Sequence, residues 1–176
     1  MPYPPQGLIG GEAAGDWEVI AEVEVEADCD YVEFTGLDIN SDVAYVLILL
    51  VKNPLSVNVT LQLIINGDAE TTNYYRQRLS ANGTSVNASN SNDNYVGGAA
   101  ANDVTNEIIW IILDKNGYTR AFTTQLYGSG SGLYLFFNTI QHTVSQTNVT
   151  SIRIQASESG GIGAGSKFIL ARVKRP

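Results

Sequence analysis

The sequence predicts an all-β fold, a jelly-roll-like sandwich of two sheets in a single domain. About ten short segments of alternating or continuous apolar residues recur along the chain, with turn signals between them. No long window carries apolar residues at the i, i+3, i+4 and i+7 spacing of an amphipathic helix. With 44% hydrophobic residues, the 176-residue chain can fill one core. Strands in this number, joined by long end loops, favour a jelly roll among the two-sheet folds.

The chain begins with a segment that we expect to be an extended arm. Residues 1–15 hold three prolines and four glycines, a composition with too few large side chains to pack alone. We therefore place the β-sandwich domain at residues 16–176.

The first predicted strand starts at Trp17 and has one strongly acidic face. Small and apolar residues occupy alternate positions from Trp17 to Ala27, with Ile20 as the exception. This period of two predicts a half-buried strand. Its other face, which must meet water or a basic partner, carries Glu18, Glu22, Glu24 and Glu26.

The next strands surround an Asn-Gly turn. Residues 44–52 are nearly continuously apolar, as expected for a strand buried on both faces. Residues 57–66 alternate again and end in Asn66-Gly67, a pair typical of the type I′ turn of a hairpin. We therefore expect residues 74–80 to form the return strand, while residues 31–37 form a short strand earlier in the chain.

The second half of the chain predicts one long loop and five more strands. Residues 82–106 are rich in Asn, Ser, Gly and Ala and predict a loop, which at this length is usually functional or mobile. The strand patterns that follow cover residues 107–114, 119–127, 133–139, 149–156 and 167–174.

The charge of the chain is negative and unevenly distributed. The formal net charge is -8, which disfavours nucleic acid as a partner. Residues 1–42 hold eleven acids and no Lys or Arg, whereas residues 115–176 hold seven bases and one acid. This asymmetry predicts two solvated surfaces, or else pairing of the two chain ends within one subunit or between neighbours.

The sequence predicts no membrane span. The longest apolar run, residues 43–51, is far shorter than the ~20 residues of a membrane-spanning helix. Residues 1–5 lack the charged and apolar regions of a signal peptide. With Cys29 as the only cysteine, no intrachain disulfide forms.

Few residues are suited to catalysis or metal binding. His142 is the only histidine, and its polar neighbours predict an exposed loop position. Cys29 lies between two aspartates, whose charge raises a thiol pKa and opposes nucleophilic chemistry. The run from Asp38 to Asp42 has alternating oxygen ligands but lacks the glycine and distal glutamate of a calcium loop, and favours turn capping. We therefore expect a protein without catalytic residues, bound metal or cofactor.

Tyrosines are the best binding candidates. Several lie in or near predicted loops and strand ends, among Asn, Ser and Gly, a combination common at recognition surfaces. They are also suited to the core or its rim. The candidates that we select are Tyr74, Tyr75, Tyr95 and Tyr118.

Four segments, in order, carry a family resemblance. They are the opening-strand motif Phe34-Thr35-Gly36-Leu37, a hydrophobic strand ending in Asn66-Gly67-Asp68, the strand motif Asn73-Tyr74-Tyr75-Arg76-Gln77-Arg78-Leu79, and the late motif Gly163-Ala164-Gly165-Ser166-Lys167-Phe168. In these the chain resembles virion proteins of tailed bacteriophages and related prokaryotic viruses, over about residues 31–173. It departs from them in its basic end, residues 172–176, and in its acidic first strand.

The resemblance implies a non-enzymatic structural protein of the virion with a jelly-roll-like fold. Such a protein is a capsid decoration, vertex or spike protein or a tail-fibre component, assembled in the host cytoplasm as a homo-oligomer. Its partners are other copies of itself and other virion proteins. A trimeric state would favour a spike or fibre protein, and a pentameric state would favour a vertex protein. The alternative is a carbohydrate-binding or receptor-binding, lectin-like module that recognises a host surface glycan.

Overall fold

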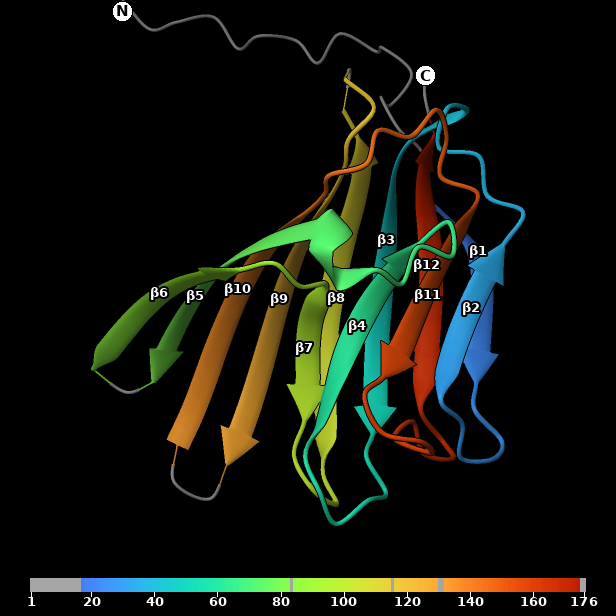
Figure 1. The fold of residues 1–176 in the computed structure, drawn as a ribbon. Helices are drawn as coiled ribbons and strands as arrows, with labels where there is room; N and C mark the ends of the chain where they lie inside the picture. Colours follow the sequence, from blue (N-terminus) through green and yellow to red (C-terminus); the bar gives the residue numbers. More distant parts are fainter. Residues whose placement is uncertain (1–16, 83, 115, 130–131, 175–176) are drawn as a thin grey trace, which may run out of the picture.

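The protein is an all-β sandwich of two antiparallel sheets, as the sequence predicts (Figure 1). The computed structural model describes residues 17–82, 84–114, 116–129 and 132–174, so the predicted arm at residues 1–15 lies outside the described residues. The strands of the large sheet, in spatial order, are β1 (Trp17–Glu24), β12 (Lys167–Lys174), β3 (Asp42–Lys52), β8 (Val104–Leu113), β9 (Thr119–Ser129), β10 (Gly132–His142), β5 (Tyr74–Asn82) and β6 (Ser85–Ser91). Those of the small sheet are β2 (Tyr31–Thr35), β11 (Ser151–Ala156), β4 (Val59–Ile65) and β7 (Tyr95–Ala99).

The strand order is that of a jelly roll with additions. The chain crosses between the sheets at every connection except β5–β6, β8–β9 and β9–β10. Setting aside β1, β12, β9 and β10 leaves two four-stranded sheets, β2-β11-β4-β7 and β3-β8-β5-β6. These eight strands have the two-sheet arrangement of a jelly roll. The β9–β10 hairpin widens the large sheet in its middle, and β1 and β12 extend it at one edge.

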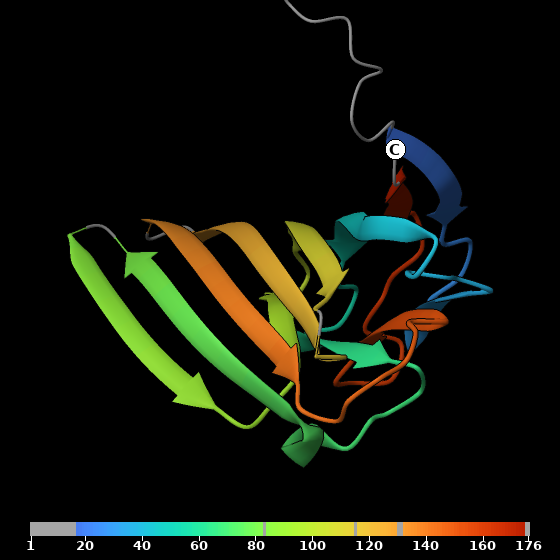
Figure 2. The same cartoon turned by 90° about the horizontal axis from the view of Figure 1, so that it is seen from above.

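The sheets cover each other over only part of the large sheet. The buried core lies where the small sheet packs, and includes Leu47, Leu61, Leu63, Ile109 and Ile152. Beyond β7, strands β5 and β6 of the large sheet curve away with no strand of the small sheet opposite them (Figure 2). This overhang gives the large sheet a concave inner face that the small sheet leaves open.

The predicted loop at residues 82–106 is wrong, because it contains β6, β7 and the start of β8. The sequence SVNASNS of β6 is mostly polar, and this edge strand is exposed along nearly its whole length. The YVGGA sequence of β7 has adjacent glycines, which usually indicate a loop. Here Gly97 is required for packing, because a Cβ at this position would overlap the Glu107 carboxyl group.

The Asn66-Gly67 turn has the predicted conformation but not the predicted partners. Both residues have positive φ, 52° and 76°, as a type I′ turn requires. The predicted hairpin is wrong, however, because β4 pairs with β11 and β7 whereas β5 pairs with β10 and β6. The Tyr74 hydroxyl donates to the Asp68 carbonyl and accepts the Ile65 N–H, which fixes this sheet-to-sheet crossing.

Replacing Gly67 with Val will lower the free energy of unfolding by about 1 kcal/mol or more. No heavy atom lies within 4 Å of a Cβ built on Gly67, so the loss comes from backbone strain at positive φ and not from a clash. Gly67→Asn is the matched control, because Asn tolerates this region better, and it should lose less. Urea unfolding measures both; equal losses would contradict a backbone origin.

The first strand contains a β-bulge that corrects its predicted faces. The β1–β12 register shifts between Val19 and Ala21, so the extra residue is Ile20. A bulge moves the following side chains to the opposite face. Trp17 and Val19 therefore share the outer face of the sheet with Glu22 and Glu24, and Glu18 points to the inner side.

The acidic first strand and the basic last strand lie side by side, which gives the charge asymmetry an intrachain explanation. Strands β1 and β12 are neighbours, and Glu18 pairs with Arg172 at 2.7 Å and with Lys174 at 2.8 Å. The Lys174 and Arg172 side chains hold the pKa of Glu18 below its ordinary value. At the other end of β1, Glu24 pairs with Lys167 at 3.3 Å. Much of the glutamate charge is thus compensated within one subunit.

Candidate functional site

The outer face of the large sheet carries an extended apolar surface. The strand register aligns its side chains in rows across all eight strands. One row is Val19, Ala171, Val46, Trp110, Phe122, Thr139, Gln77 and Asn90. The next is Glu22, Ile169, Ile48, Ile108, Thr124, Phe137, Leu79 and Ala88, and Glu22 at its edge is the only charged residue in both rows.

Two tryptophans cover small residues at one end of this surface. The rings of Trp17 on β1 and Trp110 on β8 meet edge to face, with centroids 5.1 Å apart. Strands β12 and β3 run between them and place small or β-branched residues, Ala171 and Val46, beneath the rings. The pair therefore packs over the sheet surface while leaving much of each ring exposed.

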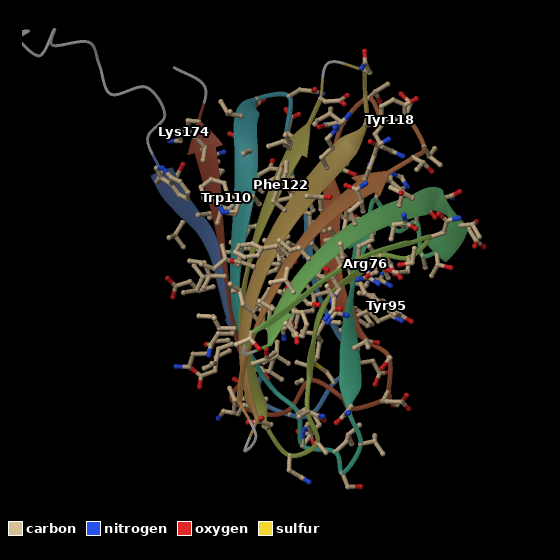
Figure 3. The ribbon with its side chains drawn as sticks, turned by 90° about the vertical axis from the view of Figure 1, so that its left-hand side faces the viewer. Arg76, Tyr95, Trp110, Tyr118, Phe122 and Lys174 are labelled. Carbon is tan, nitrogen blue, oxygen red and sulfur yellow. The ribbon has the colours of Figure 1, made fainter. Side chains whose placement is uncertain are left out.

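The apolar outer surface is larger than an ordinary exposed patch. Ten large apolar side chains on it are 39–67% exposed: Trp17, Val19, Ile48, Leu79, Val86, Ile108, Trp110, Phe122, Leu126 and Phe137. Together they expose on the order of 800 Å² of apolar area, if a large side chain offers about 150–200 Å². Monomeric proteins rarely expose patches above roughly 300–600 Å². We call this set the apolar outer face; Figure 3 shows Trp110 and Phe122 on it.

A groove lies on the opposite, concave side of the large sheet. It has a volume of about 280 Å³ and is lined by β5, β9 and β10 on one side and by β4 and β7 on the other. Its polar lining includes Arg76, Arg78, Gln125 and Asn138, and its rings are Tyr95 and Phe136. Figure 3 shows Arg76 and Tyr95 together on this side of the sheet, away from Trp110 and Phe122.

The change from core to groove follows the strand register. The inner row through Leu47 and Ile109 continues as Thr123, Asn138 and Arg78. It is apolar where the small sheet covers it and polar where the overhang begins. The same sheet face therefore forms the core at one end and the groove at the other.

The two groove arginines differ in their partners. Arg76 donates to Asp93 at 2.9 Å, to Ser91 at 3.0 Å and to Asn138 at 3.4 Å. The Arg78 guanidinium lies over the Phe136 ring, 4.0 Å from its centroid. The nearby Asp93 carboxylate pairs with Arg76, and within the described part of the chain no carboxylate lies at ion-pair distance from Arg78. Burial lowers the pKa of the Arg78 guanidinium, and the charge of Arg76 adds to this effect.

A buried carboxyl group underlies the groove. Glu107 of β8 lies on the inner face beside Gln125 of β9, under the Gly97 backbone. Neither of its carboxyl oxygens has a hydrogen-bond partner among the described residues. The nearby Thr123 hydroxyl donates instead to the Val96 carbonyl. Burial raises the pKa of Glu107 to about 8, so the group is protonated and neutral near pH 7.

The structure distributes the four predicted tyrosines over different regions. Tyr95 lines the groove and is 36% exposed. Tyr74 lies in the core at 1% exposure with its hydroxyl engaged, so it does not serve as a surface contact. Tyr75 points to the outer side of β5, and Tyr118 lies in the turn before β9. They do not form one site.

Sequence reasoning missed the arginines, Asn138 and Phe136. The alternation of Arg76 and Arg78 along β5 could have indicated a shared polar face. Nothing in the sequence places that face opposite Tyr95, because the two meet only when the sheets pack.

The predicted exposed loop position of His142 is wrong. His142 ends β10, is 1% exposed, and its Nε2 lies 2.8 Å from an Asp68 carboxylate oxygen. Its Nδ1 faces the Gln146 amide at 3.5 Å, where a catalytic triad would need a serine hydroxyl. The contact between His142 and Asp68 therefore holds in place the loop that crosses from β4 to β5.

The other candidates for chemistry have structural roles. Burial raises the pKa of the Cys29 thiol, and Asp30 and Asp28 add smaller effects in the same direction. The Asp38 carboxylate accepts hydrogen bonds from Ser41 and Asn40, as turn capping predicts. Among the residues placed by the structure, no three His, Cys, Asp or Glu side chains gather as a metal site would require.

Comparison with known proteins yields little. No family model matches the chain, and no curated protein matches it. Among solved structures, the Caenorhabditis elegans galectin LEC-6 is similar over 87% of this chain and 95% of its own, with 12% sequence identity and a TM-score of 0.33. A likeness this weak carries no argument about function. No helix in the described ranges is long and apolar enough to span a membrane.

Proposed function

We propose that the protein is a non-enzymatic structural protein of a virion that assembles as a homo-oligomer through its apolar outer face. The virion assignment rests on the ordered motifs between residues 31 and 173, and covers a capsid decoration, a vertex or spike protein and a tail-fibre component. The single observation that supports assembly is the apolar outer face, which crosses all eight strands of the large sheet.

The occupant that best fits this face is a second copy of the chain. Stable interfaces bury about 800 Å² on each partner, which is close to the apolar area exposed here. A two-fold interface uses the same patch on both subunits, and a broad sheet surface with polar Thr124, Thr139 and Gln77 among apolar side chains is suited to such self-packing. Charged side chains around it form pairs, Glu24 with Lys167 at the β1–β12 edge and Arg120 with Asp114 at the start of β9.

The mass of the protein in solution tests this proposal. We expect an oligomer by light scattering or native mass spectrometry. Its affinity should not weaken as salt rises from about 0.05 to 0.5 M, because screening acts on charges and not on apolar contacts. The acidic first strand, considered alone, predicts the opposite, namely assembly steered by charge and weakened by salt.

Two results would contradict the proposal in different ways. A monomer at all concentrations up to about 0.1 mM would exclude self-assembly through a face of this size. An oligomer that dissociates with salt would show that charged surfaces hold it together and that the apolar outer face is not the interface.

A further inference from the structure

We infer that the groove under the overhang binds a sugar that carries a carboxylate, of the uronic or sialic acid class, with Arg78 as its counter-ion. The groove lies on the face opposite the apolar outer face, so this role is separate from assembly and remains available in an assembled protein. It also gives a definite place to the glycan recognition that the sequence left as an alternative.

The positive charge of the groove favours an anion. Arg76 is satisfied by Asp93, Ser91 and Asn138, and its geometry is fixed by them. Arg78 has its guanidinium over Phe136 and no carboxylate partner among the described residues. A planar guanidinium oriented by an aromatic ring presents its N–H groups in a fork that matches a carboxylate.

The rest of the lining favours a sugar. Tyr95 offers a partly exposed ring beside Arg76, whose Cζ is 5.9 Å from the ring centroid. The buried Asn138 and Gln125 amides on adjacent strands donate to backbone carbonyls of β7 and to neighbouring threonine hydroxyls, so they hold the groove wall in place and leave the ligand contacts to Tyr95 and Arg78. Aromatic rings pack on the apolar faces of sugar rings, so Tyr95 together with the Arg78 guanidinium is suited to a ligand that has both a sugar ring and a carboxylate.

The edge of β7 argues against an acidic peptide as the ligand. Peptides bind open sheet edges by adding a strand, which requires free backbone groups on that edge. The Val96 carbonyl already accepts hydrogen bonds from Asn138 at 2.8 Å and Thr123 at 3.0 Å. The Gly98 carbonyl accepts one from the Gln125 amide. These side chains occupy the acceptors that an added strand would need.

The test compares trigalacturonic acid with its trimethyl ester, which keeps the shape and loses the charge. Calorimetry at about 0.05 M salt should show the acid binding at least roughly tenfold more tightly than the ester, since a charged hydrogen bond is stronger than a neutral one. Arg78→Gln should remove that preference and leave ester binding unchanged. Tyr95→Ala should weaken both ligands alike, because it removes the ring and no charge.

A matched variant controls for net charge. Arg120→Gln changes the charge equally, but Arg120 lies on the outer side of β9, paired with Asp114; it should bind both ligands like the natural chain. Equal binding of acid and ester, or no binding of either, would overturn the proposal. Binding of hexaglutamate that is as tight, and as dependent on Arg78, would assign the groove to acidic peptides. The oligomeric mass of Arg78→Gln should not change, so failure here leaves the assembly proposal intact.

Discussion

Raising the pH from about 5 to 9 will destabilise the protein by several kcal/mol through Glu107 alone. The folded protein holds this carboxyl group neutral, with a pKa of about 8 against 4.5 when it is solvated. Below the solvated value the group is protonated in both states and has no effect on stability. Between the two values the unfolded state ionises first, so stability falls as pH rises and levels off above the folded pKa. The full difference is on the order of 3–5 kcal/mol.

Glu107→Gln isolates this effect. The amide has nearly the same shape and no charge, so its stability should lack the decline between about pH 5 and 9. Urea unfolding at several pH values measures the difference between variant and natural chain, which should grow with pH. Glu33→Gln is the control, because Glu33 is partly exposed and paired with Arg153. A constant difference between Glu107→Gln and the natural chain would mean that water or another group stabilises the Glu107 anion.

Placing one charge in the apolar outer face will dissociate the oligomer. Phe122 lies in the middle of this face, opposite Trp110 across the β8–β9 pair, and is 46% exposed. In an interface its replacement by Glu would bury an unpaired charge, so we expect Phe122→Glu to weaken association by at least about 100-fold. Analytical ultracentrifugation over a concentration series measures this loss.

Two variants separate assembly from folding. Phe122→Ala removes the same ring opposite Trp110 without adding charge, so it should weaken association less than Phe122→Glu. Val144→Glu places the same charge on a residue of similar exposure in the loop after β10, and it should assemble normally. If Val144→Glu dissociates the oligomer as strongly as Phe122→Glu, the interface lies at the loop end of the sandwich.

Local sequence patterns determined where many of the strands lie. β12 follows its predicted range because a run of apolar residues, Phe168–Ala171, begins shortly after a glycine-rich segment. β3 is close to its range because it is continuously apolar, although the prediction that both its faces are buried is wrong, since Ile48 is 45% exposed on the outer face. The positive φ angles of Asn66 and Gly67 were also predictable, since few other residues adopt them readily. These features depend on residues within a few positions of one another.

Tertiary structure decided what those strands face. The Asn-Gly turn leads from one sheet to the other, because β5 pairs not with β4 but with the next strand, β6, and with β10, which is far away in the sequence. The bulge at Ile20 placed Trp17 on the outer face, where Trp110 meets it. The glycines of β7 signal a loop in sequence, yet they form a strand because β7 pairs with β4, and a Cβ at Gly97 would overlap the Glu107 carboxyl group. A sequence period of two shows that side chains alternate between the two faces of a strand. Only the pairing of distant strands determines which face becomes core, groove or exposed apolar surface.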